Sequence, residues 1–415
     1  MFLTSEFEYT VSTFLPKGFQ FAGVSCGIKA KPNTKDVAVI WSDVPAVAAG
    51  VYTQNQVVAA PVILCRNRTP LANARGIVIN SGNANACTGS QGDADAQRMC
   101  ELLAESRAAL PAADATLQAE QIMVMSTGVI GRFLPMDKIA AGITQAARQL
   151  AATEQAYLDA ADAIMTTDQG RKITTRQCQI GDRTVSIAGM AKGAGMIGPN
   201  MATMLCCVTT DAPLASLQAQ EVLTAAANKS FNNISVEGHT STNDSMLLLA
   251  NGASGGEPLA GEELQTFAAH LEAMCIELAK QIPSDGEGAT HLIEVRVSGA
   301  QSDTDARKIS HCVASSNLVK TAIYGSDPNW GRIVSAAGYA GAPIETAQLS
   351  LRVNHIPLFE SGEPLSFDAK QASDSIRGNH TTLIDLRVGR GPGCCTHWTS
   401  DLTPAYVHFN SEYTT

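Results

Sequence analysis

Short runs of apolar and β-branched residues recur along the chain, separated by clusters of glycine, proline, asparagine and serine. Runs of roughly four to eight such residues, bounded by turn residues, are typical of buried strands. The predicted strands cover residues 37–41, 62–65, 76–80, 121–125, 184–188, 204–210, 246–250, 292–297, 348–353 and 382–388.

Longer segments between these runs carry apolar residues at helical spacing. They predict helices over residues 93–108, 217–229 and 262–281, and one or two helices over 136–164. Strands and helices alternate irregularly, without a strict βαβ repeat or a solenoid period. The pattern therefore predicts an α+β fold built of sandwich layers.

Residues 190–211 change character halfway along. Residues 193–199 hold three glycines and a proline, so the backbone there can take conformations that ordinary side chains resist. The apolar run 204–210 follows. At the seam between the two halves, the hydroxyl of Thr203 could attack the carbonyl carbon of Ala202 if the peptide bond were strained. Hydrolysis of the resulting ester would make Thr203 the first residue of a second chain.

A chain that begins at Thr203 would carry its own base. The unperturbed pKa of an α-amino group is about 7.7–8.0, so this amine can take the proton of the neighbouring hydroxyl and activate it as a nucleophile. Lys192 is a nearby cation that could stabilise the developing oxyanion. A solvated loop lysine explains the same residue.

Two other interpretations of residues 193–211 stay open on spacing alone. Residues 193–198 satisfy G-x-G-x-x-G, but a dinucleotide fingerprint should open a helix, and here Pro199 and a strand-like run follow. A glycine turn that leads into a core strand is the simplest interpretation. Spacing favours this turn first, self-cleavage second and dinucleotide binding third.

Composition excludes several classes of function. The 415 residues are 45% apolar and 16% charged, with a net charge of −10, which argues against binding to nucleic acid or to an anionic membrane surface. No run approaches the roughly 18 apolar residues of a membrane span. The start of the chain lacks the pattern of a signal peptide, so we expect a cytoplasmic protein. Eleven scattered cysteines without a C-x-x-C pair predict reduced thiols and no metal site.

The predicted strand 121–125 delivers Ser126, Thr127 and Gly128 to its end. A threonine hydroxyl and a backbone N–H freed by glycine could together donate to an oxyanion. A plain turn explains the same residues.

Several blocks of the chain resemble one family. The sequence Lys-Gly-Ala-Gly-Met-Ile-Gly-Pro-Asn-Met-Ala-Thr-Met-Leu at 192–205 closely resembles the processing site of the ornithine acetyltransferases, the glutamate N-acetyltransferases of arginine biosynthesis. Further blocks resemble the family in family order, at 126–131, 165–168, 241–244, 285–290, 327–332 and 410–415. The resemblance spans nearly the whole chain.

The resemblance implies roles for single residues. Thr203 matches the nucleophile, cleavage falls between Ala202 and Thr203, and Thr127 with Gly128 matches the oxyanion pair. The implied substrate-binding residues are Thr166 (chosen over Thr167), Lys192, Thr203, Glu287, Asn410 and Thr415. Two places depart from the family pattern: His239 stands where an acidic residue is common, and residues 389–395 lack a usual aspartate.

The resemblance also implies a fold and a reaction. The fold is an α/β/β/α-type sandwich with a smaller C-terminal α/β part. Cleavage yields an α chain of residues 1–202 and a β chain of residues 203–415, assembled as a heterotetramer of two of each. Thr203 takes acetyl from N2-acetyl-L-ornithine and passes it to L-glutamate, with no metal or organic cofactor. Whether acetyl-CoA also donates stays open.

Three rival functions remain. A self-processed amidase or aminopeptidase would use the same Thr203 machinery with water as acceptor. A dinucleotide-dependent oxidoreductase predicts an uncleaved chain. A binding module predicts ligand binding without turnover.

Overall fold

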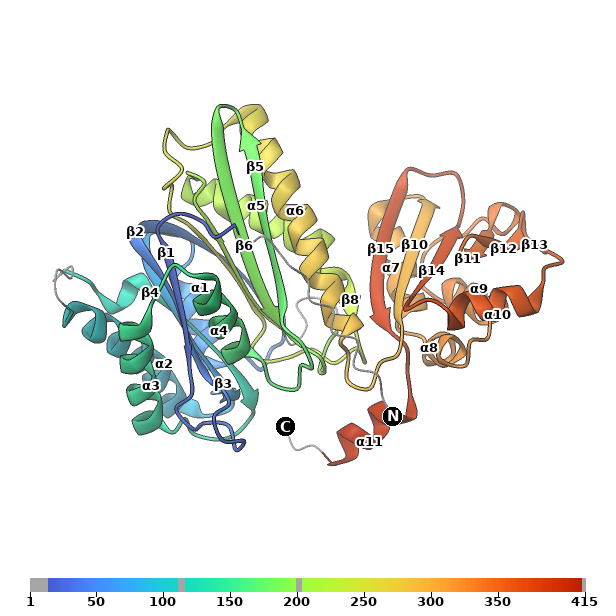
Figure 1. The fold of residues 1–415 in the computed structure, drawn as a ribbon. Coiled ribbons are helices and arrows are strands. Elements are labelled where there is room, and N and C mark those ends of the chain that lie inside the picture. The colour runs from blue at the N-terminus through green and yellow to red at the C-terminus, as the bar shows by residue number, and fades with distance from the viewer. Residues whose placement is uncertain (1–13, 111–115, 199–203, 413–415) are drawn as a thin grey trace.

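The computed structural model of the protein describes residues 14–110, 116–198 and 204–412. Ala202, Thr203 and Thr415 lie outside these residues. Two β-sheets, each with its own helices, stand side by side in Figure 1, and the predicted α+β class is confirmed.

The first sheet has eight strands within the described residues, in the order β4-β3-β2-β9-β7-β6-β5, with β1 paired to β2. Its strands are β1 (Phe19–Val24), β2 (Val37–Tyr52), β3 (Leu71–Asn83), β4 (Ile122–Val129), β5 (Lys172–Ile180), β6 (Arg183–Lys192), β7 (Leu205–Thr210) and β9 (Ser245–Ala250). Its helices are α1 (Ala60–Arg68), α2 (Gly89–Ala108), α3 (Met136–Gln149), α4 (Glu154–Ile164), α5 (Ser216–Lys229) and α6 (Gly261–Ser284).

The long strand β2 folds this sheet into two layers. Its first half pairs with β1 and β3, the register breaks between Trp41 and Ala46, and its second half pairs with β9. The two halves of the sheet face each other, since Cys207 Sγ of β7 lies 3.5 Å from Met125 Sδ of β4. Helices α1–α4 share a core with β1–β4, whereas α5 and α6 pack on the outside of β5–β7 and β9. This is the predicted α/β/β/α sandwich.

The C-terminal part forms a second, smaller layer pair. Within the ranges that the structure describes, its sheet has seven strands in the order β13-β12-β11-β14-β10-β15-β8. The strands are β8 (Ile234–Ser235), β10 (Leu292–Ala300), β11 (Ser350–Val353), β12 (Ile356–Glu360), β13 (Glu363–Pro364), β14 (Thr381–Arg387) and β15 (Gly393–Ser400). The helices of this part are α7 (Asp303–Ala314), α8 (Asn317–Tyr324), α9 (Trp330–Gly338) and α10 (Ala369–Arg377). Helices α7–α9 and Ile376 of α10 bury the apolar face of the sheet.

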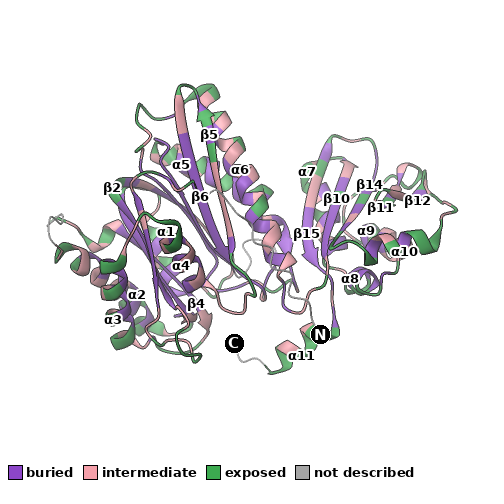
Figure 2. Ribbon diagram, viewed as in Figure 1, coloured by how far each residue is buried: buried purple, intermediate pink, exposed green. Residues whose placement is uncertain are grey.

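The last helix, α11 (Pro404–Glu412), leaves the C-terminal sheet and lies apart from it, near the lower end of the first sheet (Figure 1). Figure 2 shows that strand β6 of the first sheet is buried along most of its length. Strands β7 and β9 are buried along their whole length. A continuous apolar run therefore predicts these two strands correctly.

One predicted strand is wrong. Residues 62–65 belong to helix α1, where Pro61 occupies the first turn. Proline is favoured there because its missing N–H is not needed and its φ already suits a helix. The segment 136–164 forms two helices, α3 and α4. The glycine-rich residues 193–198 follow β6, and no helix begins within them. A dinucleotide-binding turn leads directly into a helix, so this argues against dinucleotide binding.

Among the described residues, no helix combines the length and the apolar character that crossing a bilayer requires. The same residues contain no group of three or more histidine, cysteine, aspartate or glutamate side chains placed to hold a metal ion.

Candidate active site

A cavity of about 250 Å³ lies where the ends of β4 and β6 meet several loops and helix α11. Six residues singled out by the sequence line it together: Thr127, Gly128, Thr166, Lys192, Glu287 and Asn410. Thr167 lines it as well, so the cavity does not decide between Thr166 and Thr167. The other lining residues are Ala84, Ile130, Gly195, Met196, Glu237, His239, Ser241, Asn243 and Tyr406.

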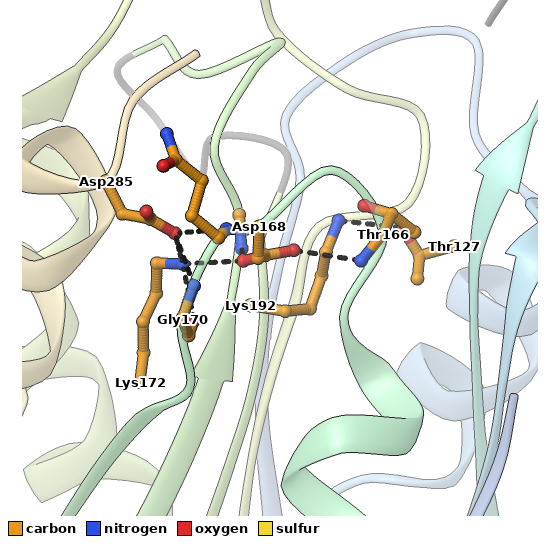
Figure 3. Close-up of polar contacts among 9 residues, drawn as sticks. Thr127, Thr166, Asp168, Gly170, Lys172, Lys192 and Asp285 are labelled. Atoms are coloured by element: carbon orange, nitrogen blue, oxygen red, sulfur yellow. Dashed lines mark hydrogen bonds and ion pairs between the residues drawn. The ribbon is translucent and has the colours of Figure 1, made fainter. Parts of the chain in front are cut away.

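Thr127 and Lys192 come from opposite layers of the sandwich and meet at its edge. Lys192 Nζ lies 3.1 Å from Thr127 Oγ1 (Figure 3). An ammonium group can only donate hydrogen bonds, so the threonine oxygen accepts this one and its hydroxyl hydrogen remains available to a ligand. Burial lowers the pKa of Lys192, and the carboxylate of Asp168 opposes that shift.

Gly128 is required by a close approach of two strands. It lies opposite Gly82 in the parallel β3–β4 pair and has a φ of +134°. A Cβ atom at this position would lie 2.3 Å from the carbonyl carbon of Gly82, so no other residue fits without a shift of the backbone.

Asp168 joins three segments next to the cavity-lining residues Thr166 and Lys192. The backbone N–H groups of Thr166 and Gly193 donate to its carboxylate at 2.9 and 2.6 Å, and Lys172 Nζ donates at 2.7 Å. Burial alone would raise the pKa of Asp168, but the ammonium groups of Lys172 and Lys192 hold it at about 2. Lys172 also donates to Asp285 at 2.6 Å (Figure 3). Asp168 is therefore ionised and holds the backbone at Thr166 and at Gly193 in place.

Glu287 and Asn410 line the cavity beside Gly195. Asn410 Nδ2 of α11 donates to Glu287 Oε2 at 3.0 Å. The backbone N–H of Glu287 donates to the carbonyl of Ala194 at 2.9 Å. A Cβ atom at Gly195 would lie 2.3 Å from Glu287 Oε2, so glycine leaves the room that this carboxylate occupies.

Asp244 holds the first described residue after position 203. Its Oδ1 accepts a hydrogen bond of 3.1 Å from the backbone N–H of Met204, and the residue is fully buried at the start of β9. Burial raises its pKa well above the usual range, although the Met204 amide opposes the shift. The sequence predicts that residues 239–244 hold turns near the active site, without giving Asp244 a catalytic or substrate-binding role.

Asn243, the neighbour of Asp244, ties two strand ends together. Its Nδ2 donates to the carbonyl oxygens of Ala84 and Ser126 at 2.6 and 2.9 Å. Sequence reasoning also missed Glu237 and Tyr406 at the cavity wall. His239, which departs from the family pattern, lies at this wall and is exposed.

The family model of ArgJ matches residues 20–415. The chain belongs to the ArgJ family. The family predicted from the sequence is thereby confirmed, and the described part of the cavity is built largely from blocks that carried the resemblance.

Curated ArgJ relatives match over nearly their full length. The arginine biosynthesis bifunctional protein ArgJ of Rhodopirellula baltica is 51% identical, with 98% of each chain covered. The protein of the same description from Symbiobacterium thermophilum is 47% identical over 96% of this chain and 98% of that one. A chloroplastic ArgJ of Populus trichocarpa is 43% identical over 96% and 83%.

Solved structures of ArgJ proteins are also similar. A crystal structure of ArgJ from Bacillus halodurans matches with 38% identity and a TM-score of 0.48, over 49% of this chain and 97% of that chain. The ornithine acetyltransferase of Mycobacterium tuberculosis, crystallised with ornithine, matches with 38% identity and a TM-score of 0.40, over 44% and 92%.

Proposed function

We propose that this protein is a glutamate N-acetyltransferase that moves acetyl from N2-acetyl-L-ornithine to L-glutamate through an acetyl-Thr203 ester. Membership of the ArgJ family supports this activity, because the relatives are described as bifunctional arginine biosynthesis proteins. The observation that carries the site is the Lys192–Thr127–Gly128 group at the cavity wall.

The first step we propose is self-cleavage between Ala202 and Thr203. The Thr203 hydroxyl attacks the Ala202 carbonyl carbon, the C–N bond breaks, and the nitrogen leaves as the α-amine of Thr203. Water then hydrolyses the ester. Asp244, which binds the next backbone amide at Met204, would fix the direction in which this segment enters β7.

Acetyl transfer then runs in two halves. The Thr203 oxygen attacks the acetyl carbon of acetylornithine while its proton passes to the α-amine. The oxyanion accepts hydrogen bonds from the Thr127 hydroxyl and the Gly128 N–H, and Lys192 strengthens the first donor by polarising its oxygen. The proton goes to the departing ornithine nitrogen as the C–N bond breaks. The amine of glutamate repeats the attack on the ester and regenerates Thr203.

Substrate contacts are proposed for Thr166, Lys192, Glu287, Asn410 and Thr415. The described members line the cavity, which holds both the Lys192 ammonium and the Glu287 carboxylate. Acetylornithine carries an α-carboxylate and a side-chain ammonium, so this pair of opposite charges supports such a substrate.

Two measurements test the proposal. Mass spectrometry of the purified protein should show two fragments, the second beginning at Thr203, and Thr203→Ala should remain a single inactive chain. Labelled acetylornithine incubated with glutamate should yield labelled acetylglutamate. A stable single chain with full activity would overturn the mechanism, and release of free acetate regardless of glutamate would favour the amidase instead.

Finer points are proposed on the same basis. The word bifunctional in the relatives' description supports a second acyl donor, and acetyl-CoA is our candidate, tested by its consumption in the presence of glutamate alone. We also propose a heterotetramer of two α chains (1–202) and two β chains (203–415) in the cytoplasm. Native mass spectrometry would reveal the assembly, and cell fractionation would test the location.

A further inference from the structure

Glu237 is a cavity residue that the proposed mechanism does not use. It lies two residues beyond β8 and lines the cavity. Its Oε1 accepts a hydrogen bond of 2.6 Å from the backbone N–H of Ile197. Its Oε2 is shielded from solvent and has no hydrogen-bond partner among the described residues. A buried carboxylate oxygen without a donor, at the wall of a ligand cavity, is placed to receive one from the ligand.

The charges around Glu237 come from several elements. Glu287 approaches from the loop after α6, Tyr406 from α11, and Lys320 from α8, while His239 follows in the same loop. Lys320 is buried behind Glu237 and donates to the carbonyl of Val236. Lys192, the cation that lines the cavity, donates to Thr127. Two carboxylates therefore share the cavity, and Oε2 of Glu237 is buried without a hydrogen-bond donor in the part of the chain that the structure describes.

In the proposed reaction, one cavity must bind two substrates whose side chains carry opposite charges. Acetylornithine carries a side chain that ends in an ammonium group, and glutamate carries one that ends in a carboxylate. Both amino acids must place their α-nitrogen at the same acetyl group, so their side chains point into the same region. A permanently ionised carboxylate there would attract the first substrate and repel the second.

Glu237 is suited to exist in both protonation states. Burial and the neighbouring Glu287 raise its pKa to about 7, while the backbone N–H of Ile197 and the ammonium of Lys320 oppose the rise. The ionised and neutral forms are therefore both populated near neutral pH.

We propose that Glu237 recognises the side-chain ends of both substrates, as a carboxylate that accepts from the ornithine ammonium and as a carboxylic acid that donates to the glutamate carboxylate. The inference rests on the proposed function. The proton balance is simple: Glu237 takes one proton from solvent when glutamate binds, and returns it when acetylglutamate leaves and the next acetylornithine binds.

The test is the pH dependence of KM in the wild type and in Glu237→Gln. In the wild type, the KM of acetylornithine should rise as pH falls through about 7, and the KM of glutamate should rise as pH increases. The glutamine amide still donates to a carboxylate but cannot pair with an ammonium. We therefore expect a KM for acetylornithine that is about 10- to 100-fold higher, since hydrogen bonds between charged groups have roughly this strength.

For glutamate, the ratio of the variant KM to the wild-type KM should fall as pH increases from 6 to 8.5. This ratio removes the titration of the substrate's own amine. Two controls are matched to the change. N2-acetyl-L-norvaline, an acyl donor with an uncharged side chain, should show the same KM with both enzymes. Glu360→Gln, an exposed change on β12 of the C-terminal sheet, should behave as the wild type.

A second measurement avoids the variant altogether. Calorimetric titration of the wild-type enzyme with glutamate, in buffers of different ionisation enthalpy near pH 7.5, should show uptake of close to one proton. Uptake of no proton, or a Glu237→Gln variant with unchanged KM values and unchanged pH dependence, overturns the inference. A wild-type enzyme that forms no acetylglutamate from acetylornithine would instead overturn the proposed function.

Discussion

The cavity end of the first sheet and the outer face of the C-terminal sheet differ in how far their charged side chains are exposed. On the C-terminal sheet, Arg296, Arg352 and Asp385 lie side by side on neighbouring strands and are exposed, while apolar residues fill the other face. At the cavity end of the first sheet, Lys172 and Lys192 are buried. Burying an ion costs free energy unless it is paired and hydrogen-bonded. The cavity end of the first sheet is therefore less stable than an apolar packing would be, because it holds buried charges close together. The face of the C-terminal sheet that carries Arg296, Arg352 and Asp385 instead keeps its charges in water, as is usual for a sheet with one solvated face.

The largest expected effect is on the buried charges of the first sheet. Asp168→Asn removes a buried carboxylate from Lys172 and Lys192, and breaking such a group should lower the free energy of unfolding by about 3–5 kcal/mol. Urea unfolding measures the loss. Asp385→Asn, the matched change on the exposed face, should stay within about 0.5 kcal/mol of the wild type. Equal losses of stability in the two variants would show that the buried charges of the first sheet matter no more than the exposed charges of the C-terminal sheet.

A second change should separate activity from stability. Thr127→Val removes the hydroxyl that Lys192 polarises and should lower kcat for acetyl transfer by about 10²–10³-fold, the usual effect of losing one oxyanion donor. Steady-state rates at saturating substrate, with the extent of chain cleavage checked by mass spectrometry, provide the measurement. Thr381→Val, at an exposed position of β14, is the control. A loss below tenfold would remove Thr127 from the proposed oxyanion site.

The C-terminal core contains a buried histidine whose protonation should make stability depend on pH. His397 is fully buried beside His311, and neither ring nitrogen has a partner among the described residues. Burial and His311 lower its pKa well below 6.5. Below pH 6.5 the unfolded chain binds a proton that the folded chain excludes, so stability should fall by up to about 1.4 kcal/mol per pH unit.

His397→Leu should abolish this part of the acid sensitivity. Urea midpoints of the wild type and the variant between pH 7.5 and 5 supply the test, and their difference cancels the other titrating groups. Parallel curves would show that His397 makes no contribution.

The smallest effect should come from shortening one apolar side chain in the core of the C-terminal sheet. Ile384→Val removes one methylene group from a fully buried position of β14 and should lower stability by about 0.5–1.5 kcal/mol with kcat unchanged. Thermal unfolding and the transfer assay measure both. A changed kcat would mean that the C-terminal sheet positions the site more directly than its packing indicates.

The sequence predicted the elements whose environment is uniform along their length. Residues 204–210 form a continuous apolar run because β7 is buried on both faces, and α6 carries a clear helical stripe. The segment 62–65 was assigned wrongly because a four-residue apolar run fits a buried helix equally well. Only its flanking proline distinguished the two.

The site was predictable mainly through family resemblance. For Thr127 and Gly128, local patterns predicted a turn as readily as a functional site. For Asp168, they predicted no function. The role of Asp168 depends on Gly193, which lies 25 residues away, and its partner Lys172 also binds Asp285, 113 residues further along the chain. Glu237 and Asp244 were missed for the same reason, because their importance comes from burial beside distant backbone N–H groups.

The strand order of the first sheet has a consequence for a chain that has been cut after residue 202. Strands β7 and β9 follow the cut, yet they sit between β6 and β2, which precede it. Each of the two junctions is a ladder of six residue pairs. Cleavage would therefore create two new chain termini without separating the two fragments. The later fragment is hydrogen-bonded on both sides to strands of the earlier one, so the fragments can dissociate only if both ladders open.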